Sequence, residues 1–165
     1  MLSTNYYGSL AMTQEIFPLI RSGGRLVNVC SMDGALEIYS VPLREAFISA
    51  SKTSVAACSA LMEKFASDVK AKKEIQEGWL PNAYAVSKAG EIAFTKAIAM
   101  DEEKSGRKRN VLINSCCPGF VNTDMTKGHG VKTIDEGATT PVLLALGDIG
   151  GSLGEFWQNE NIIEW

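Results

Sequence analysis

PNAYAVSKAGEIAFTKAIAMDEEK, residues 81–104, decides the fold of this chain because it lies between two short runs rich in β-forming residues. These runs are RLVNVCS at residues 25–31 and NVLINSCC at residues 110–117. Within the stretch, apolar residues recur at helical spacing, Asn82 is suited to the N-cap, and Gly106 supplies a stop. The sequence therefore predicts a strand, a long helix and a second strand, as in a parallel sheet.

The flanking segments continue this alternation of helices and strands. Residues 3–21 predict a helix that ends before Gly23-Gly24, and residues 41–81 predict one or two surface helices. Thr133 and Glu136 match a capping box at the start of a further helix, and GEFWQ at residues 154–158 predicts a last short strand. The pattern indicates one α/β domain with a doubly wound parallel sheet over residues 1–165.

Composition favours a small-molecule partner. The 165 residues are 45% hydrophobic and 21% charged, with a formal net charge of −3, which is typical of a soluble domain without a nucleic-acid footprint. No apolar run approaches the roughly 18 residues of a membrane span, and four cysteines without C-x-x-C spacing suit a reducing compartment. We therefore expect a cytoplasmic protein. His129 is the only histidine, which excludes a serine-hydrolase triad and a histidine-rich metal site.

Tyr84 and Lys88 are the residues best placed for chemistry. Four residues apart on a helix, they project from the same face. At about 5 Å and an effective dielectric near 20, the attraction between ammonium and phenolate is on the order of 3 kcal/mol, which favours proton transfer by the phenol. An isolated pair at this spacing is often only a surface contact. Here, Ser31 and Pro118-Gly119 follow two predicted parallel strands, at the edge where α/β sheets bind ligands.

Four motifs in order give a specific family resemblance: Asn5-Tyr-Tyr-Gly8, Asn28-Val-Cys-Ser31, Tyr84-x-x-x-Lys88 and Cys117-Pro-Gly119-x-Val121-x-Thr123. They resemble the second-half motifs of the short-chain dehydrogenases/reductases. The resemblance implies a catalytic tetrad of Asn5, Ser31, Tyr84 and Lys88. In it the tyrosine is the general acid, the serine orients the carbonyl, the lysine binds the nicotinamide ribose, and the asparagine holds a relay water.

The resemblance also implies cofactor and substrate contacts. Cofactor contacts would come from Tyr84, Lys88, Pro118, Gly119, Val121, Asn122 and Thr123, and substrate contacts from Ser31, Met32, Phe120 and Met125. The helical insertion at residues 41–81, which ends in Gly78-Trp79-x-x-x-Ala83-Tyr84, is similar to that of the NADPH-dependent carbonyl reductases. It implies NADPH as cofactor, carbonyl compounds as substrates and a monomer. The charge balance and the lack of a long apolar run predict no nucleic-acid or membrane partner, and the single histidine predicts no metal site.

The glycine-rich turn of a dinucleotide-binding fold does not occur in these residues. We therefore expect the C-terminal part of a Rossmann-like sheet, with the first four strands absent, an exposed sheet edge, and weak NADPH binding by the chain alone. An incomplete gene model, a truncated isoform and a rebuilt binding protein are the alternatives. The competing functional hypothesis is accordingly a catalytically inactive fragment that acts as a binding or regulatory protein.

Other residues have simpler interpretations. Cys30 and Cys58 are expected in the core, whereas Cys117 could be either a core residue or a reactive thiol. Lys127 and Lys132 are interpreted as solvated charges, and the glycines of residues 147–154 as turns.

Overall fold

The computed structural model describes all of residues 1–165, and its elements follow the predicted alternation. A π-helical turn, Ser3–Gly8, leads into α1 (Ser9–Ile16) and a short 3-10 turn, Phe17–Leu19. The other helices are α2 (Val41–Thr53), α3 (Val55–Lys70), α4 (Ala83–Lys104) and α5 (Ile134–Leu146). The strands are β1 (Arg25–Val29), β2 (Leu112–Cys117), β3 (Phe156–Gln158) and β4 (Asn161–Ile163). None of the helices combines the length and apolar character needed to cross a membrane.

The four strands form one sheet in the order β1-β2-β3-β4. The pairs β1–β2 and β2–β3 are parallel, as predicted, and β3–β4 is antiparallel. The sequence analysis missed β4, which is three residues long and follows a tight turn. In that turn Asn159 and Glu160 both adopt positive φ without a glycine, so the usual hairpin signal is absent.

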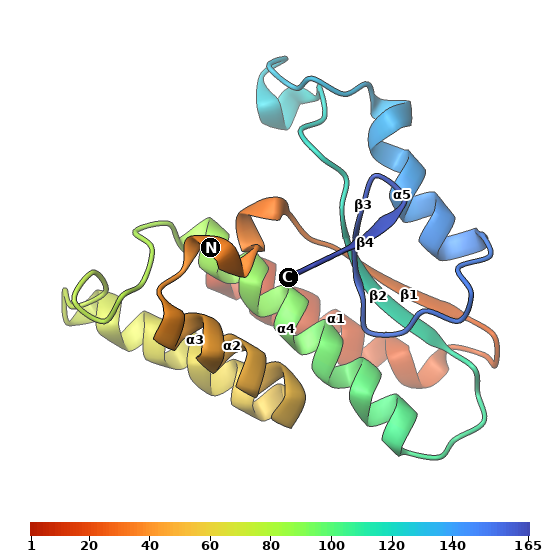
Figure 1. Cartoon of the computed structure of the whole chain (residues 1–165), viewed down its shortest axis with the longest axis horizontal. Coiled ribbons are helices and arrows are strands. Elements are labelled where there is room, and N and C mark those ends of the chain that lie inside the picture. Colours follow the sequence, from red (N-terminus) through yellow and green to blue (C-terminus); the bar gives the residue numbers. More distant parts are fainter.

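Helices cover both faces of the sheet (Figure 1). The face toward α4 is lined by Cys30, Cys117 and Phe156, which pack with Ile92 of that helix. On the opposite face Cys116 and Trp157 pack against Leu144 of α5. The helices α2 and α3 lie on the side of α4 away from the sheet and share its core cluster (Figure 1). The central helix α4 is therefore buried along most of its length, which fixes its position relative to the strand ends.

The strand β1 forms one edge of the sheet. Residues 25–31 were predicted to form a strand buried on both faces, but residues 25–28 are only partly buried and Val29 is 46% exposed. The reason is that β1 has β2 as its only strand neighbour, so its other edge is open. The expectation of an exposed edge is thus confirmed, whereas the expectation of complete burial is wrong.

An arginine–carboxylate pair ties the end of α4 to the segment before β2. Arg109 donates two hydrogen bonds of 3.0 Å to Glu102, whose side chain is 5% exposed. These bonds lower the pKa of Glu102 in the folded protein. The pair therefore contributes its full stabilisation above the ordinary glutamate pKa of about 4.3, and this contribution is lost as the pH falls through the lowered pKa of the folded state. We expect Arg109→Met to cost about 2 kcal/mol at pH 7 and less at pH 3, as measured by urea unfolding. Lys108→Met is the control, and an equal loss in both variants would contradict the prediction.

Candidate active site

The predicted site residues that follow strands lie at one edge of the sheet. Val29 of β1 pairs with Cys116 of the parallel strand β2, and the Cys30 amide donates to the Cys116 carbonyl at 2.6 Å. Ser31 and Pro118 come directly after these paired strand ends. The carboxyl ends of two neighbouring parallel strands therefore bring the Ser31 turn and the Pro118 loop together.

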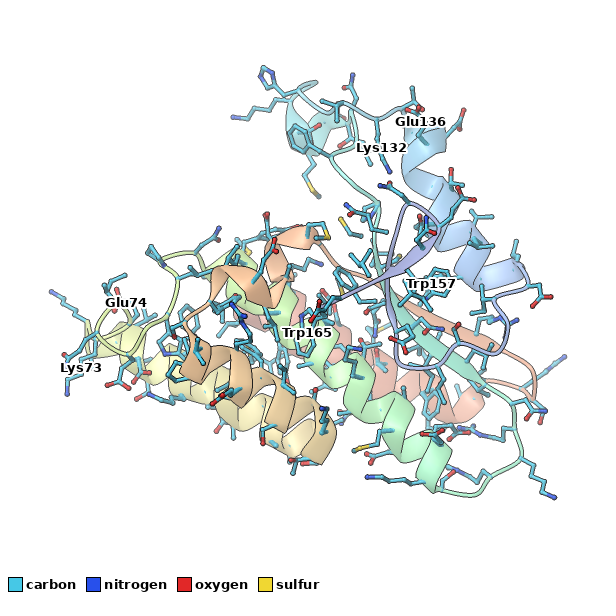
Figure 2. The ribbon with its side chains drawn as sticks, in the orientation of Figure 1. Lys73, Glu74, Lys132, Glu136, Trp157 and Trp165 are labelled. Atoms are coloured by element: carbon cyan, nitrogen blue, oxygen red, sulfur yellow. The ribbon has the colours of Figure 1, made fainter.

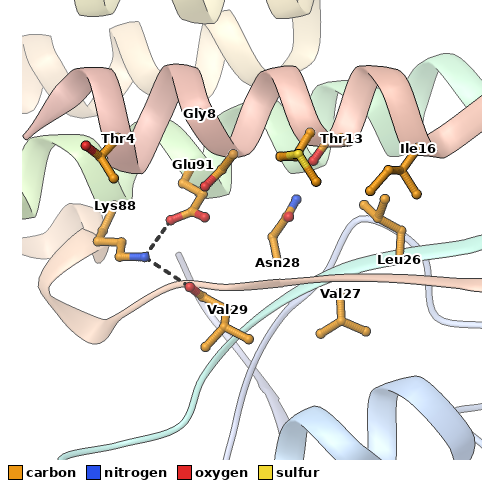
Figure 3. A pocket seen from close by; sticks show the side chains of 12 residues that line it. Thr4, Gly8, Thr13, Ile16, Leu26, Val27, Asn28, Val29, Lys88 and Glu91 are labelled. Carbon is orange, nitrogen blue, oxygen red and sulfur yellow. Dashed lines mark hydrogen bonds and ion pairs between the residues drawn. The ribbon is translucent and has the colours of Figure 1, made fainter.

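The first turns of α4 direct Lys88 to the same edge. The Asn82 side chain accepts hydrogen bonds from the amides of Tyr84 and Ala85 at 3.0 and 3.1 Å, which confirms it as the N-cap. One turn after Tyr84, the Lys88 ammonium donates to the Val29 carbonyl at 3.0 Å and to Glu91 Oε2 at 2.7 Å (Figure 3). Lys88 is thus anchored at the last residue of β1, two residues before Ser31.

Ser31 lies in a turn that rests on α4. Its hydroxyl oxygen accepts a hydrogen bond from the Asp33 amide at 3.1 Å and begins a 3-10 turn, Met32–Gly34. A Cβ on Gly34 would lie 2.7 Å from the Lys88 carbonyl carbon and 2.8 Å from the Ala89 amide nitrogen. Only glycine allows this approach, which holds the turn against the backbone of Lys88. The Ser31 hydroxyl hydrogen remains available to donate.

This close approach yields a prediction about Gly34. We expect Gly34→Ala to destabilise the fold by about 1–3 kcal/mol, because the added methyl meets helix backbone that cannot rotate away. The matched control is Gly8→Ala in the first helix, where the nearest atom would lie at 3.4 Å and no clash is expected. Urea unfolding of both variants tests the prediction, and a Gly34→Ala protein as stable as the Gly8→Ala protein would contradict it.

Asn5 reaches the same part of α4 from the first helix. Its side-chain amide donates to Ser87 Oγ at 3.1 Å, and Ser87 lies between Tyr84 and Lys88 in the chain. Asn5 belongs to the π-helical turn Ser3–Gly8, a rare conformation that is frequent at functional sites. The structure therefore brings Asn5, Ser31, Tyr84 and Lys88 to one end of α4, although the hydroxyl of Tyr84 has no hydrogen-bond partner within the chain.

The loop after β2 is held by Lys132. Its ammonium donates to the Pro118 carbonyl at 3.3 Å and to Asn159 Oδ1 at 2.7 Å, and its side-chain stem fills the space that a Cβ on Gly119 would need. The interpretation of Lys132 as a solvated charge is therefore wrong, because the ammonium bridges this loop and the β3–β4 turn. Figure 2 labels Lys132 near Glu136 in the first turn of α5. Gly119 has a φ of 85°, a backbone conformation that favours glycine, and a side chain at this position would also collide with Lys132.

The remaining predicted residues of this loop are more exposed. Val121 pairs with Lys132 in an isolated bridge, and Thr123 caps the short turn Asp124–Thr126. Asn122 is exposed, as are Phe120 at 53% and Met125 at 91%. Their loop projects from the sheet edge (Figure 1), whereas Met32 packs beside Cys30 and Phe156. The structure thus separates Phe120 and Met125 from the compact group around Lys88.

Glu91 is a site residue that the sequence analysis missed. Its side chain is 5% exposed and pairs with Lys88, three residues earlier on α4. The helical spacing i, i+3 is the signal that could have found it. A pocket of about 510 Å³ lies between α1 and the open edge of β1, with Lys88 and Glu91 in its lining (Figure 3). Neither Ser31 nor Tyr84 lines this pocket.

The cysteines are all free and buried. Burial raises the pKa of Cys58 and of Cys116 to about 12 and raises that of Cys30 well above its ordinary value. Cys30 and Cys58 are thus confirmed as core residues. Cys117 is 4% exposed, and its sulfur accepts a hydrogen bond from the Gly119 amide at 3.3 Å. This burial favours the core interpretation of Cys117 over a reactive thiol.

Comparisons with known proteins agree with this arrangement. The family model described as short chain dehydrogenase matches residues 75–132. Carbonyl reductase (NADPH) 3 of Mus musculus is 39% identical over 147 residues, covering 88% of this chain and 53% of that protein. Carbonyl reductase (NADPH) 1 of the same species is 37% identical over 168 residues, covering 99% and 60%.

Solved structures show the same likeness. Salutaridine reductase from Papaver somniferum superposes with a TM-score of 0.80 at 29% identity, covering 95% of this chain and 53% of that one. Menthone neomenthol reductase from Mentha piperita gives 0.73 at 28% identity, covering 96% and 49%. The chain therefore spans about half the length of the relatives it matches.

Proposed function

We propose that this chain belongs to the short-chain dehydrogenase family and carries the catalytic centre of an NADPH-dependent carbonyl reductase. The observation that supports this most is the position of Lys88. Its ammonium is anchored at the end of β1, on the same helix as Tyr84 and against the turn that contains Ser31. These are the residues that a carbonyl reduction needs in one place: a proton donor, a cation and a hydroxyl donor.

The residues present fit a nicotinamide cofactor. An ammonium has three N–H donors, and those of Lys88 that bond Val29 and Glu91 leave one for a ribose hydroxyl. We propose that Tyr84 and the loop of Pro118, Gly119, Val121, Asn122 and Thr123 complete the cofactor contacts. NADPH, when bound, supplies the hydride.

The proposed mechanism assigns one role to each side chain. Tyr84 donates its phenolic proton to the carbonyl oxygen as the carbonyl carbon is reduced. Lys88 stabilises the phenolate that remains, and the Ser31 hydroxyl donates a hydrogen bond to the same oxygen. Asn5 holds a water that returns a proton to Tyr84. The product is the alcohol, with the hydride on carbon and the proton on oxygen.

We propose aldehydes, ketones and quinones as the substrate class. Met32 would offer an apolar contact near the reacting carbonyl, and Phe120 and Met125, whose loop projects from the sheet edge, would contact a more distant part of the substrate. We also propose a cytoplasmic monomer without nucleic-acid or membrane partners, since the inserted helices α2 and α3 cover a face of α4 that would otherwise be open to another subunit. Gel filtration tests the monomer directly.

The activity is tested with the gene product that carries this chain. The purified protein is incubated with NADPH or NADH and a panel of quinones, aldehydes and ketones, and cofactor absorbance is followed. We expect NADPH to be oxidised with at least one of these carbonyls, and faster than NADH. A folded protein that oxidises neither cofactor with any member of the panel would overturn the proposed function.

A further inference from the structure

The ion pair between Lys88 and Glu91 is buried within the candidate site. The two side chains are 14% and 5% exposed, and Lys88 Nζ lies 2.7 Å from Glu91 Oε2. Lys88 is the only cation that pairs with Glu91. Burial raises the pKa of Glu91, against the lowering influence of Lys88, of Ser9 on α1 and of Cys30 after β1. Exposed ion pairs at this helical spacing contribute a few tenths of a kcal/mol to stability. In a buried pair, removing one partner leaves the other charge without compensation, which is much more costly.

Burial by itself lowers the pKa of Lys88. Desolvation is the largest influence on the pKa of Lys88 and lowers it, yet the hydrogen bond and charge of Glu91 outweigh it, so that the pKa is raised. The other groups that face Lys88 are the Cys30 thiol and the Tyr84 phenol, and both contribute less than Glu91. Glu91 is therefore the main group that offsets the effect of burial on the pKa of Lys88.

We propose that Glu91 is a positioning residue for the reduction: it holds Lys88 charged and directed at the end of β1, with one N–H left for the cofactor. This inference rests on the proposed function, because it gives Glu91 a role through Lys88 rather than through substrate. The geometry agrees with it, since the Val29 carbonyl and the Glu91 carboxylate together fix the ammonium from two directions (Figure 3).

The test is a pH titration of Lys88 in the 165-residue chain by NMR, with lysine labelled at Cε and the Lys88 signal assigned by its loss in Lys88→Met. In the unmodified chain we expect a midpoint above the ordinary lysine value of about 10.4. In Glu91→Gln we expect it below that value, because burial persists without the carboxylate. Glu91→Asp, which keeps the charge on a shorter side chain, should lie between them and serves if Glu91→Gln does not fold. Glu103→Gln, the same charge change at an exposed position of α4, should leave the midpoint unchanged.

Two outcomes separate this inference from the proposed function. A Lys88 midpoint in Glu91→Gln equal to that of the unmodified chain would overturn the role of Glu91, whatever the activity. Absence of carbonyl reduction by the gene product would overturn the proposed function, but it would not change the result of the Lys88 titration or what that result says about Glu91. Where activity is present, we expect the alkaline limb of the pH–rate profile to move to lower pH in Glu91→Gln and not in Glu103→Gln.

Discussion

Replacing Tyr84 with phenylalanine is expected to lower carbonyl reduction by the gene product at least 100-fold, roughly the effect of removing a general acid. The substitution deletes only the phenolic oxygen, which has no hydrogen-bond partner within the chain, so the fold should be unaffected. Without the phenol, no side chain would protonate the carbonyl oxygen as hydride is transferred to the carbonyl carbon, and the reduction would therefore be slow. Steady-state rates with saturating NADPH and a quinone measure the effect, and thermal unfolding verifies that the variant is folded.

Tyr7→Phe is the matched control for this substitution. Tyr7 is 37% exposed and its hydroxyl forms no side-chain hydrogen bond, so the same atom is removed from a tyrosine that has no role in the proposed mechanism. We expect its turnover to match that of the unmodified protein. Equal turnover in Tyr84→Phe and Tyr7→Phe would remove Tyr84 from the mechanism.

Phe94→Ala is expected to destabilise the fold by about 3–5 kcal/mol, because it leaves a cavity in the main core. Phe94 is fully buried on α4, and its ring packs edge-on against Tyr6 with centroids 5.5 Å apart. Tyr6 neighbours Asn5 in the π-helical turn and bonds Ser59 of α3 through its hydroxyl at 3.0 Å. The cavity therefore loosens the packing that holds the Asn5 turn against α4.

Urea unfolding measures this loss, with Phe120→Ala as the control for a phenylalanine that is 53% exposed. We expect the control to change stability by less than about 0.5 kcal/mol. A Phe94→Ala protein that unfolds at the same urea concentration as the control would show that the core is not organised around the contact of Tyr6 with Phe94.

The strongly periodic elements of the fold could be predicted from sequence. The helix after Asn82, the strand that ends at Cys117 and the capping box at Thr133 each combine a repeating pattern with a start or stop signal, and each was found. The strand β4 could not be predicted, because its turn uses Asn159 and Glu160 at positive φ in place of glycine. The incomplete burial of β1 depends on which strands flank it, which residues 25–31 do not encode by themselves.

The candidate site was predictable where spacing or motif order signals a role. The i, i+4 spacing of Tyr84 and Lys88 and the strand-end positions of Ser31 and Pro118 led to residues that the structure places at one edge of the sheet. Glu91 was missed because a glutamate on a helix is usually solvated, and its burial arises from the tertiary packing of α4, which the local sequence pattern does not encode. Lys132 was misread because its partners, Pro118 and Asn159, are distant in sequence.

The most direct test of the central claim is the fate of the hydride. The gene product is supplied with a carbonyl substrate and NADPH that is deuterated at its hydride-donating carbon, and the alcohol is analysed by mass spectrometry and NMR. Direct reduction at the site around Tyr84 and Lys88 predicts one deuterium on the carbinol carbon and none exchanged with solvent, with the yield lost in Tyr84→Phe. An alcohol without deuterium, or deuterated equally by Tyr84→Phe, would contradict the account.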